Sequence, residues 1–200
     1  EIYPSSEAFI QVSTLSREEI QTTGTIALCK FNRLMITTPR ALVYGYPWLD
    51  TLAHEYAHFV IVKASDNNVP IWLHEGIAKF EETRWRTAEG GQLEPSITSV
   101  LAEAIARDHF IAFERMHPSI AKLPSAWEAQ LAFAEVVSAI GFIQKKAGKD
   151  ALPRLLSEMK NGATPQEAVA RVTNTPWTDF DGTWKQYLRA QNYKQIPGLA

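Results

Sequence analysis

The residues best suited to chemistry form an H-E-x-x-H pattern, His54-Glu55-Tyr56-Ala57-His58. Four residues make about one turn of an α-helix, so on a helix both imidazoles project from one face and can bind the same ion. Two imidazoles and a carboxylate suit zinc, with a fourth position left for water. Zinc lowers the pKa of that water toward ~7, and Glu55 can accept its proton. The pattern therefore predicts one zinc ion per chain and a hydrolytic reaction at a carbonyl group.

A second cluster, Trp72-Leu73-His74-Glu75-Gly76, supplies the candidate for the third zinc ligand. It follows the histidines after a short break, so two antiparallel helices would bring Glu75 beside them. His74 is the rival ligand, but it neighbours Glu75 and points in another direction on a helix. Glu82 and Asp50 are candidates to accept the free N–H of a zinc-bound imidazole. A simpler interpretation of Asp50 is a carboxylate favoured near a helix N-terminus.

Two helices must position these residues. Apolar residues recur every three or four positions from Trp48 to Ile61, which predicts a helix with one buried face. Asp66-Asn67-Asn68 ends it, and the apolar period resumes over residues 71–85. The chain before them is β-rich, with strands expected at residues 7–12, 25–31 and 34–38. The capping-box spacing of residues 16–19 predicts a short helix between the first two strands.

The segment Glu89-Gly90-Gly91 is the best internal seam of the chain. We therefore expect a single domain over residues 1–200, in which residues 1–89 form a β-rich part with both metal-binding helices. Residues 90–200 then form a helical part, with helices expected at residues 97–107, 129–144, from 165 onward, and 178–189. The length of the apolar segment 129–144 and its charged Glu135 favour a core helix over a membrane span. The fold class is α+β.

Composition narrows the classes of function. The 200 residues carry 46% hydrophobic and 21% charged side chains, which is ordinary for a soluble globular protein. Twenty Lys and Arg against 22 Asp and Glu give a net charge of −2 with no basic block, which argues against nucleic acid and anionic membranes as partners. The single Cys29 excludes an internal disulfide, and a buried inert thiol is favoured over a metal ligand. Because the chain begins at Glu1, we expect it to be a processed or excised segment; this segment is not expected to insert in a membrane.

The two motifs together, H-E-Y-A-H at 54–58 and W-L-H-E-G-I-A at 72–78, resemble the gluzincin metallopeptidases, particularly bacterial peptidase-MA-like domains. The resemblance implies a zincin-like fold in which His54, His58 and Glu75 hold zinc and Glu55 is the general base. It implies a peptide or protein substrate that adds a strand to an exposed sheet edge, at residues 25–28 or 34–37. Such domains are often exported, so a periplasmic or secreted location in a bacterium is favoured.

Position 133 departs from the residue pattern of the family that this chain resembles. Related domains often carry a tyrosine where this chain has Phe133, and a tyrosine hydroxyl near zinc can stabilise an oxyanion. Candidates to replace that donor are Tyr46 and His117, and also Tyr44, His109 and Tyr187, although a surface or packing role is favoured for each.

The sequence thus predicts a zinc-dependent peptidase. A weakly active or inactive zinc-binding domain that binds peptides or supports a larger protein is the alternative, and a hydrolase of non-peptide amides is a third hypothesis. Endo- or exopeptidase action, side-chain specificity and oligomeric state are left open.

Overall fold

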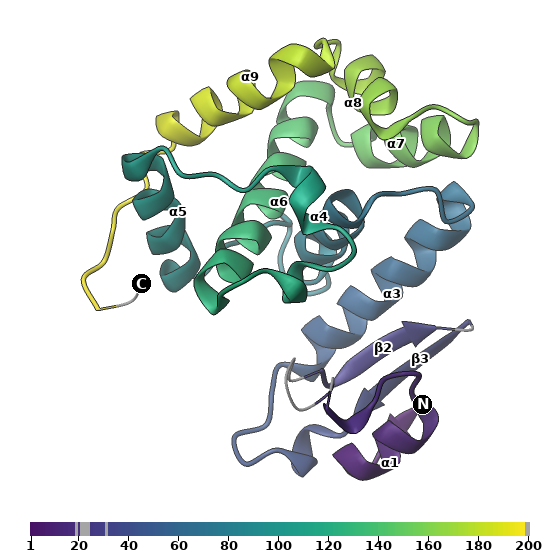
Figure 1. The fold of residues 1–200 in the computed structure, drawn as a ribbon. Coiled ribbons are helices and arrows are strands. Elements are labelled where there is room, and N and C mark those ends of the chain that lie inside the picture. Colours follow the sequence, from purple (N-terminus) through teal and green to yellow (C-terminus); the bar gives the residue numbers. More distant parts are fainter. Residues whose placement is uncertain (19, 21–24, 31, 199–200) are drawn as a thin grey trace.

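The computed structural model describes residues 1–18, 20, 25–30 and 32–198. A small N-terminal part with a sheet lies at one end, and a larger helical part lies at the other (Figure 1). The sheet part contains β1 Ile2–Tyr3, α1 Ser6–Val12, β2 Ala27–Lys30, β3 Arg33–Thr37 and the 3-10 turn η1 Pro39–Ala41. The remaining elements are α3 Trp48–Ser65, α4 Ile71–Glu81, α5 Pro95–Arg107, the 3-10 turns η2 Phe113–Met116 and η3 Ile120–Lys122, α6 Ala126–Ala147, α7 Ala151–Lys160, α8 Pro165–Thr173 and α9 Trp177–Ala190. The predicted mixture of a small sheet and many helices is confirmed.

The described sheet has three strands in the order β1-β3-β2. β1 is parallel to β3, with Ile2 opposite Ile36, and β2 is antiparallel to β3, with Ala27 opposite Ile36. β3 is therefore the central strand, and the prediction that residues 34–37 form an exposed edge is wrong. β2 is an edge strand, and it packs against α3.

The predicted strand at residues 7–12 is wrong, because this segment forms the helix α1. The Ser5 hydroxyl accepts a hydrogen bond from the Ala8 N–H at 3.2 Å and caps the helix. Phe9 is fully buried against Ile20 and Met35. The short apolar segment Ala8-Phe9-Ile10 is compatible with a strand, but the cap and the burial of Phe9 decide for a helix. The predicted capping box ends at Glu19, which lies outside the described residues.

The second metal-bearing helix, α4, ends at Glu81, four residues before the predicted end. The chain then turns back, and the Gly91 N–H donates to the Phe80 carbonyl at 2.8 Å. Gly91 has φ of +71°, and a Cβ there would lie 2.4 Å from the Phe80 ring. The glycine is therefore required for the chain to pass this close to the end of α4.

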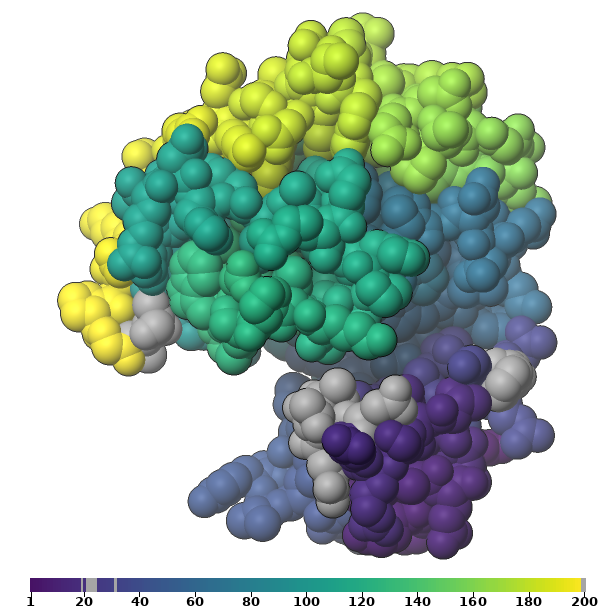
Figure 2. Space-filling model, in the orientation of Figure 1, coloured from purple at the N-terminus to yellow at the C-terminus, as the bar shows by residue number. Residues whose placement is uncertain are grey.

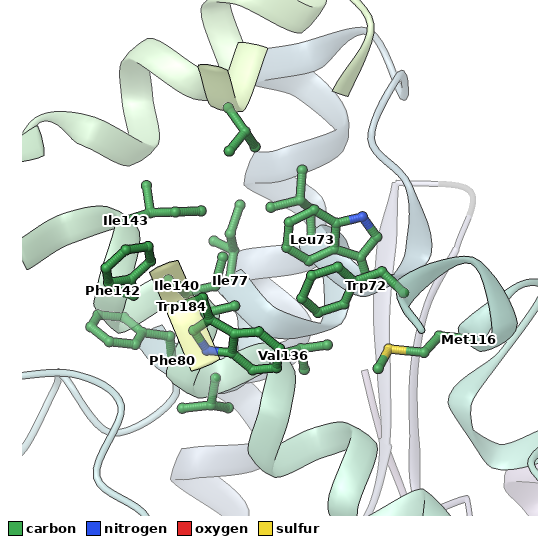
Figure 3. Close-up of a cluster of buried hydrophobic side chains, with 14 of the residues drawn as sticks. Trp72, Leu73, Ile77, Phe80, Met116, Val136, Ile140, Phe142, Ile143 and Trp184 are labelled. Atoms are coloured by element: carbon green, nitrogen blue, oxygen red, sulfur yellow. The ribbon is translucent and has the colours of Figure 1, made fainter. Parts of the chain in front are cut away.

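Helix α6 is the centre of the hydrophobic core and packs against α4 and α5. Trp72, Leu73 and Ile77 of α4 meet Val136 and Ile140 of α6 in this core (Figure 3). Among the described helices, α6 is long and apolar enough to cross a membrane by length and composition. Its residues from Leu131 to Ile143 are largely buried by the other helices, as expected for a core helix.

The core contains one carboxylic acid whose titration should be visible in the stability. Glu135 on α6 is fully buried, and it accepts the Ile111 N–H at 3.1 and 3.3 Å. Burial raises its pKa to about 8, against the opposing effects of the Ile111 hydrogen bond and the Lys185 charge. The negative charge of Asp181 also raises the pKa of Glu135. Glu135 is therefore protonated in the folded chain at pH values where it is ionised in the unfolded chain.

Between the ordinary pKa of 4.5 and about 8, the folded state thus binds more protons than the unfolded state. The free energy of unfolding should fall as the pH rises through this window. The fall amounts to about 4 kcal/mol by pH 8, and because Glu135→Gln keeps an acceptor for Ile111 and removes the charge, we expect this change to flatten it. Urea unfolding at pH 5, 6, 7 and 8 measures both effects. The exposed Glu114→Gln is the control, and equal pH profiles for the original chain and Glu135→Gln would disprove the prediction.

Candidate active site

His54 and His58 lie one turn apart on α3 and face each other. Their Nε2 atoms are 3.0 Å apart, and their ring centroids are 4.6 Å apart. The two side chains are only 16% and 14% exposed. The Nε2 atoms of both rings thus point to one common, nearly buried position, as the helical spacing predicts.

Glu75 reaches the same position from α4. Its Oε2 atom is 3.6 Å from His54 Nε2 and 3.8 Å from His58 Nε2. Ligands of a tetrahedral zinc at ~2.0 to 2.2 Å are separated from one another by about 3.3 to 3.5 Å. The three separations of 3.0, 3.6 and 3.8 Å lie on either side of this range and within about 0.3 Å of it, and the two imidazoles with a carboxylate are a donor set that zinc prefers.

Glu55 also lies close to the histidines. His54, Glu55 and His58 each offer a ligand atom within 4.8 Å of the others. The Glu55 carboxylate is buried and accepts the backbone N–H of Cys29 on β2. Because Glu75 Oε2 faces both Nε2 atoms while Glu55 is held by β2, the geometry favours Glu75 as the third ligand. Glu55 then lies beside His54 and His58, and one of its carboxylate oxygens can accept a proton.

The second nitrogen of each imidazole also has a neighbour. His54 Nδ1 lies 3.3 Å from Glu82 Oε2, and the other Glu82 oxygen pairs with Lys79 Nζ at 2.6 Å. His54 Nδ1 makes no hydrogen bond among the described residues, so Glu82 is a charged neighbour of this atom. His58 Nδ1 lies 2.7 Å from His74 Nδ1. Glu82 thus lies beside the second nitrogen of His54, as predicted. The contact between His74 and His58 was not predicted.

The charges of the site favour a cation between these side chains. Burial acts to lower the pKa of His54, but contacts with Glu75 and Glu82 outweigh it and raise the pKa to about 9. Burial lowers the pKa of His58 to about 3, with the positive charge of His54 acting in the same direction. Burial opposes ionisation of Glu75, but its contact with His54 holds the pKa of Glu75 below its usual value. A neutral His58 and an ionised Glu75 are the forms that bind a metal ion, whereas His54, with its pKa of about 9, has to release a proton when an ion binds.

Burial raises the pKa of Glu55 to about 7, and the positive charge of His54 only partly offsets this effect. A carboxylate with a pKa near neutrality is a stronger proton acceptor than an exposed one, and it releases the proton again at the same pH. The buried position of Glu55 therefore suits a group that takes up and passes on a proton.

Asp50 makes contacts away from the histidines. Its carboxylate accepts hydrogen bonds from Trp85 Nε1 at 2.8 Å and from Arg86 Nε and Nη2 at 2.9 and 2.7 Å. The bond from Arg86 is the main reason why the pKa of Asp50 is lowered. These bonds tie the first turn of α3 to the segment after α4, so the interpretation as an imidazole partner is not supported. Sequence patterns did not reveal Trp85 and Arg86 because they lie in an irregular segment.

A cavity of about 710 Å³ lies beside His54. Ile26 and Pro47 of the N-terminal part line one side of it, and residues of α5 and α6 line the other. The molecular surface is hollowed between these two parts (Figure 2). The apolar lining residues are Ile26, Pro47, Leu93, Ile97, Phe133 and Val137. Phe133 is thus a wall of the cavity next to the proposed metal position.

The predicted oxyanion donors do not line this cavity. The Tyr46 hydroxyl donates to the Thr37 carbonyl, and His117 is exposed on the chain before α6. Tyr44 is 98% exposed, His109 packs against Trp127, and Tyr187 of α9 packs against Phe142. Packing or surface roles account for all five side chains.

A histidine pair and a glutamate from two adjacent helices thus lie together beside a small sheet and a cavity. The family model described as Peptidase MA superfamily matches residues 2–190, so the chain belongs to this superfamily. The resemblance to peptidase-MA-like domains, which the two motifs predicted, is confirmed at the level of the superfamily. No curated protein and no solved structure gives a significant match to this chain.

Proposed function

We propose that this protein is a zinc-dependent peptidase with a zincin-like fold, in which His54, His58 and Glu75 hold one zinc ion. The observation that carries the proposal is the triangle of their ligand atoms, with sides of 3.0, 3.6 and 3.8 Å. Membership of the Peptidase MA superfamily supports a peptidase-related activity.

Bound zinc would polarise the carbonyl group of the substrate and make a nearby water more acidic. The protein's own contribution to catalysis centres on Glu55. Its carboxylate oxygen accepts the proton of the attacking water and delivers it to the amine nitrogen of the leaving group. The Cys29 N–H on β2 fixes the orientation of this carboxylate.

The free edge of β2 supplies a place for the substrate backbone. The Thr37 N–H donates to the Ile26 carbonyl, so residues 26, 28 and 30 direct their backbone groups toward β3. Ala27, which is 8% exposed, and Cys29 therefore direct theirs away from β3, where no other described strand pairs with β2. Because the Cys29 N–H already binds Glu55, we propose that Ala27 pairs with the substrate, which would lie as an added strand beside α3.

The test of the function is whether the purified protein cleaves a mixture of unfolded proteins. The zinc content is measured first, and cleavage is then compared with and without a chelator by mass spectrometry of the products. We expect about one zinc per chain and cleavage that the chelator abolishes. Cleavage that a chelator does not affect would contradict the proposal.

A zinc-binding domain with little activity is the second candidate function, and Phe133 is the observation that favours it. This side chain lines the cavity next to His54 and cannot donate a hydrogen bond to an oxyanion. Stoichiometric zinc without any cleavage of unfolded proteins or of small amides would establish this alternative.

The cavity beside His54 should select the side chain next to the cleaved bond. Gln130 lies at its rim on α6, so Gln130→Trp would fill part of it. We expect this change to lower kcat/KM for a peptide with phenylalanine beside the cleaved bond by at least about 10-fold relative to one with alanine. Gln144→Trp, on the same helix but away from this cavity, is the control. An unchanged ratio in Gln130→Trp would exclude the cavity from substrate selection.

A further inference from the structure

His74 makes a contact that the proposed reaction does not use. It lies in the first turn of α4, next to Glu75, and its backbone N–H donates to the Pro70 carbonyl at 2.9 Å. Its Nδ1 atom is 2.7 Å from His58 Nδ1, and the two rings meet edge to edge, with centroids 4.7 Å apart and planes inclined by 22°. The side chain is partly buried, so this contact is a fixed part of the site.

A hydrogen bond between two imidazole nitrogens has two directions with opposite consequences. A neutral imidazole carries one N–H and one lone pair. If His58 donates from Nδ1, its lone pair is on Nε2, which faces His54 Nε2 and Glu75 Oε2. If His74 donates instead, His58 carries its proton on Nε2 and cannot bind a metal ion there. The direction of this single bond therefore decides whether His58 is a ligand.

We propose that His74 is a positioning residue of the metal site, whose Nδ1 atom accepts the Nδ1–H of His58. This bond selects the tautomer of His58 with a free Nε2 lone pair, and its in-plane geometry fixes the direction of that lone pair. His74 itself then carries its proton on Nε2. Its effect on the metal passes entirely through His58.

The Nδ1 atoms of His54 and His58 thus face different kinds of neighbour. Glu82, a carboxylate, faces His54 Nδ1, while a neutral imidazole faces His58 Nδ1. Glu55, Glu75 and Glu82 already place three carboxylates around the histidines. An imidazole orients His58 without adding a further negative charge to this crowded site. The inference rests on the proposed metal site and is independent of peptidase activity.

The first test measures the zinc affinity of the full chain by competition with a chromophoric chelator, with no substrate present. His74→Phe keeps an aromatic ring at this position but removes the acceptor, and we expect its affinity to fall by about 10- to 100-fold. His74→Asn places an amide oxygen near the position of Nδ1 and should restore most of the affinity. His109→Phe, far from the histidine pair, is the control and should bind zinc like the original chain. An unchanged affinity in His74→Phe, or an equal loss in His74→Asn, would overturn the inference.

The second test does not depend on the folding of a variant. Long-range ¹H–¹⁵N spectra of the zinc-loaded original chain report which ring nitrogen of each histidine carries the proton. We expect a proton on Nδ1 of His58 and on Nε2 of His74. A proton on Nδ1 of His74, or zinc bound to His74 Nε2, would overturn the assignment. A chain that binds zinc in this way but cleaves no peptide would refute the proposed function and leave the role of His74 intact.

Discussion

Replacing Glu55 by glutamine is expected to slow peptide hydrolysis by about 100- to 10,000-fold while the zinc content stays near one per chain. The carboxylate is buried and sits beside the ligand atoms of His54 and His58, where it can accept the proton of the attacking water. Glutamine keeps the size and the oxygen that accepts the Cys29 N–H, but it cannot take up a proton at neutral pH. The loss should therefore fall on kcat with little change in KM.

The measurement is the initial rate on a peptide substrate, with zinc determined by mass spectrometry on the same sample. Glu81→Gln is the matched control, because Glu81 ends α4 and pairs with Arg84 near the surface. Full activity in Glu55→Gln would remove Glu55 from the mechanism. Loss of zinc together with activity would instead assign Glu55 as a ligand, against the role proposed for Glu75.

Replacing Glu75 by alanine is expected to weaken zinc binding by more than about 100-fold. Loss of a residue that only hydrogen-bonds to a ligand typically costs roughly 10- to 100-fold, and Glu75 is proposed to be a ligand itself. Glu75 supplies the only oxygen that the structure brings within 4 Å of both Nε2 atoms, among the described residues. Its removal leaves two nitrogen ligands for an ion that requires at least three protein ligands in a catalytic site. Activity should fall to background for the same reason.

Two measurements check this result, namely zinc affinity and the rise in melting temperature when zinc is added. Zinc that binds the folded state stabilises it, so the original chain should show a clear rise and Glu75→Ala almost none. Glu81→Ala on the same helix should retain the rise. A Glu75→Ala chain that binds zinc as tightly as the original would show that another side chain is the third ligand.

The site residues could be predicted because their arrangement is local. Four-residue spacing on a helix fixes the relation of His54 to His58, and the break at Asp66 predicts that the next helix returns toward them. Asp66 and Asn67 indeed adopt left-handed backbone angles at that turn. Glu75 and Glu82 follow from the period of the second helix.

The other features of the fold and of the site depend on contacts between distant segments, which a single sequence does not reveal. β1 is two residues long, and only its pairing with β3 more than thirty residues later makes it a strand. Trp85 and Arg86 bind Asp50 from an irregular segment with no periodic pattern. The contact of His74 with His58 depends on side-chain rotamers and on how α4 packs against α3, so the helical direction of His74 alone could not predict it.

The central claim is that His54, His58 and Glu75 bind one zinc ion, with Glu55 beside it. Anomalous diffraction from crystals of the zinc-loaded chain, collected on both sides of the zinc absorption edge, tests it most directly. We predict a single strong peak at about 2.0 to 2.2 Å from His54 Nε2, His58 Nε2 and a Glu75 carboxylate oxygen. A peak bound by Glu55 or His74 in place of Glu75, or no peak near the histidine pair, would contradict it.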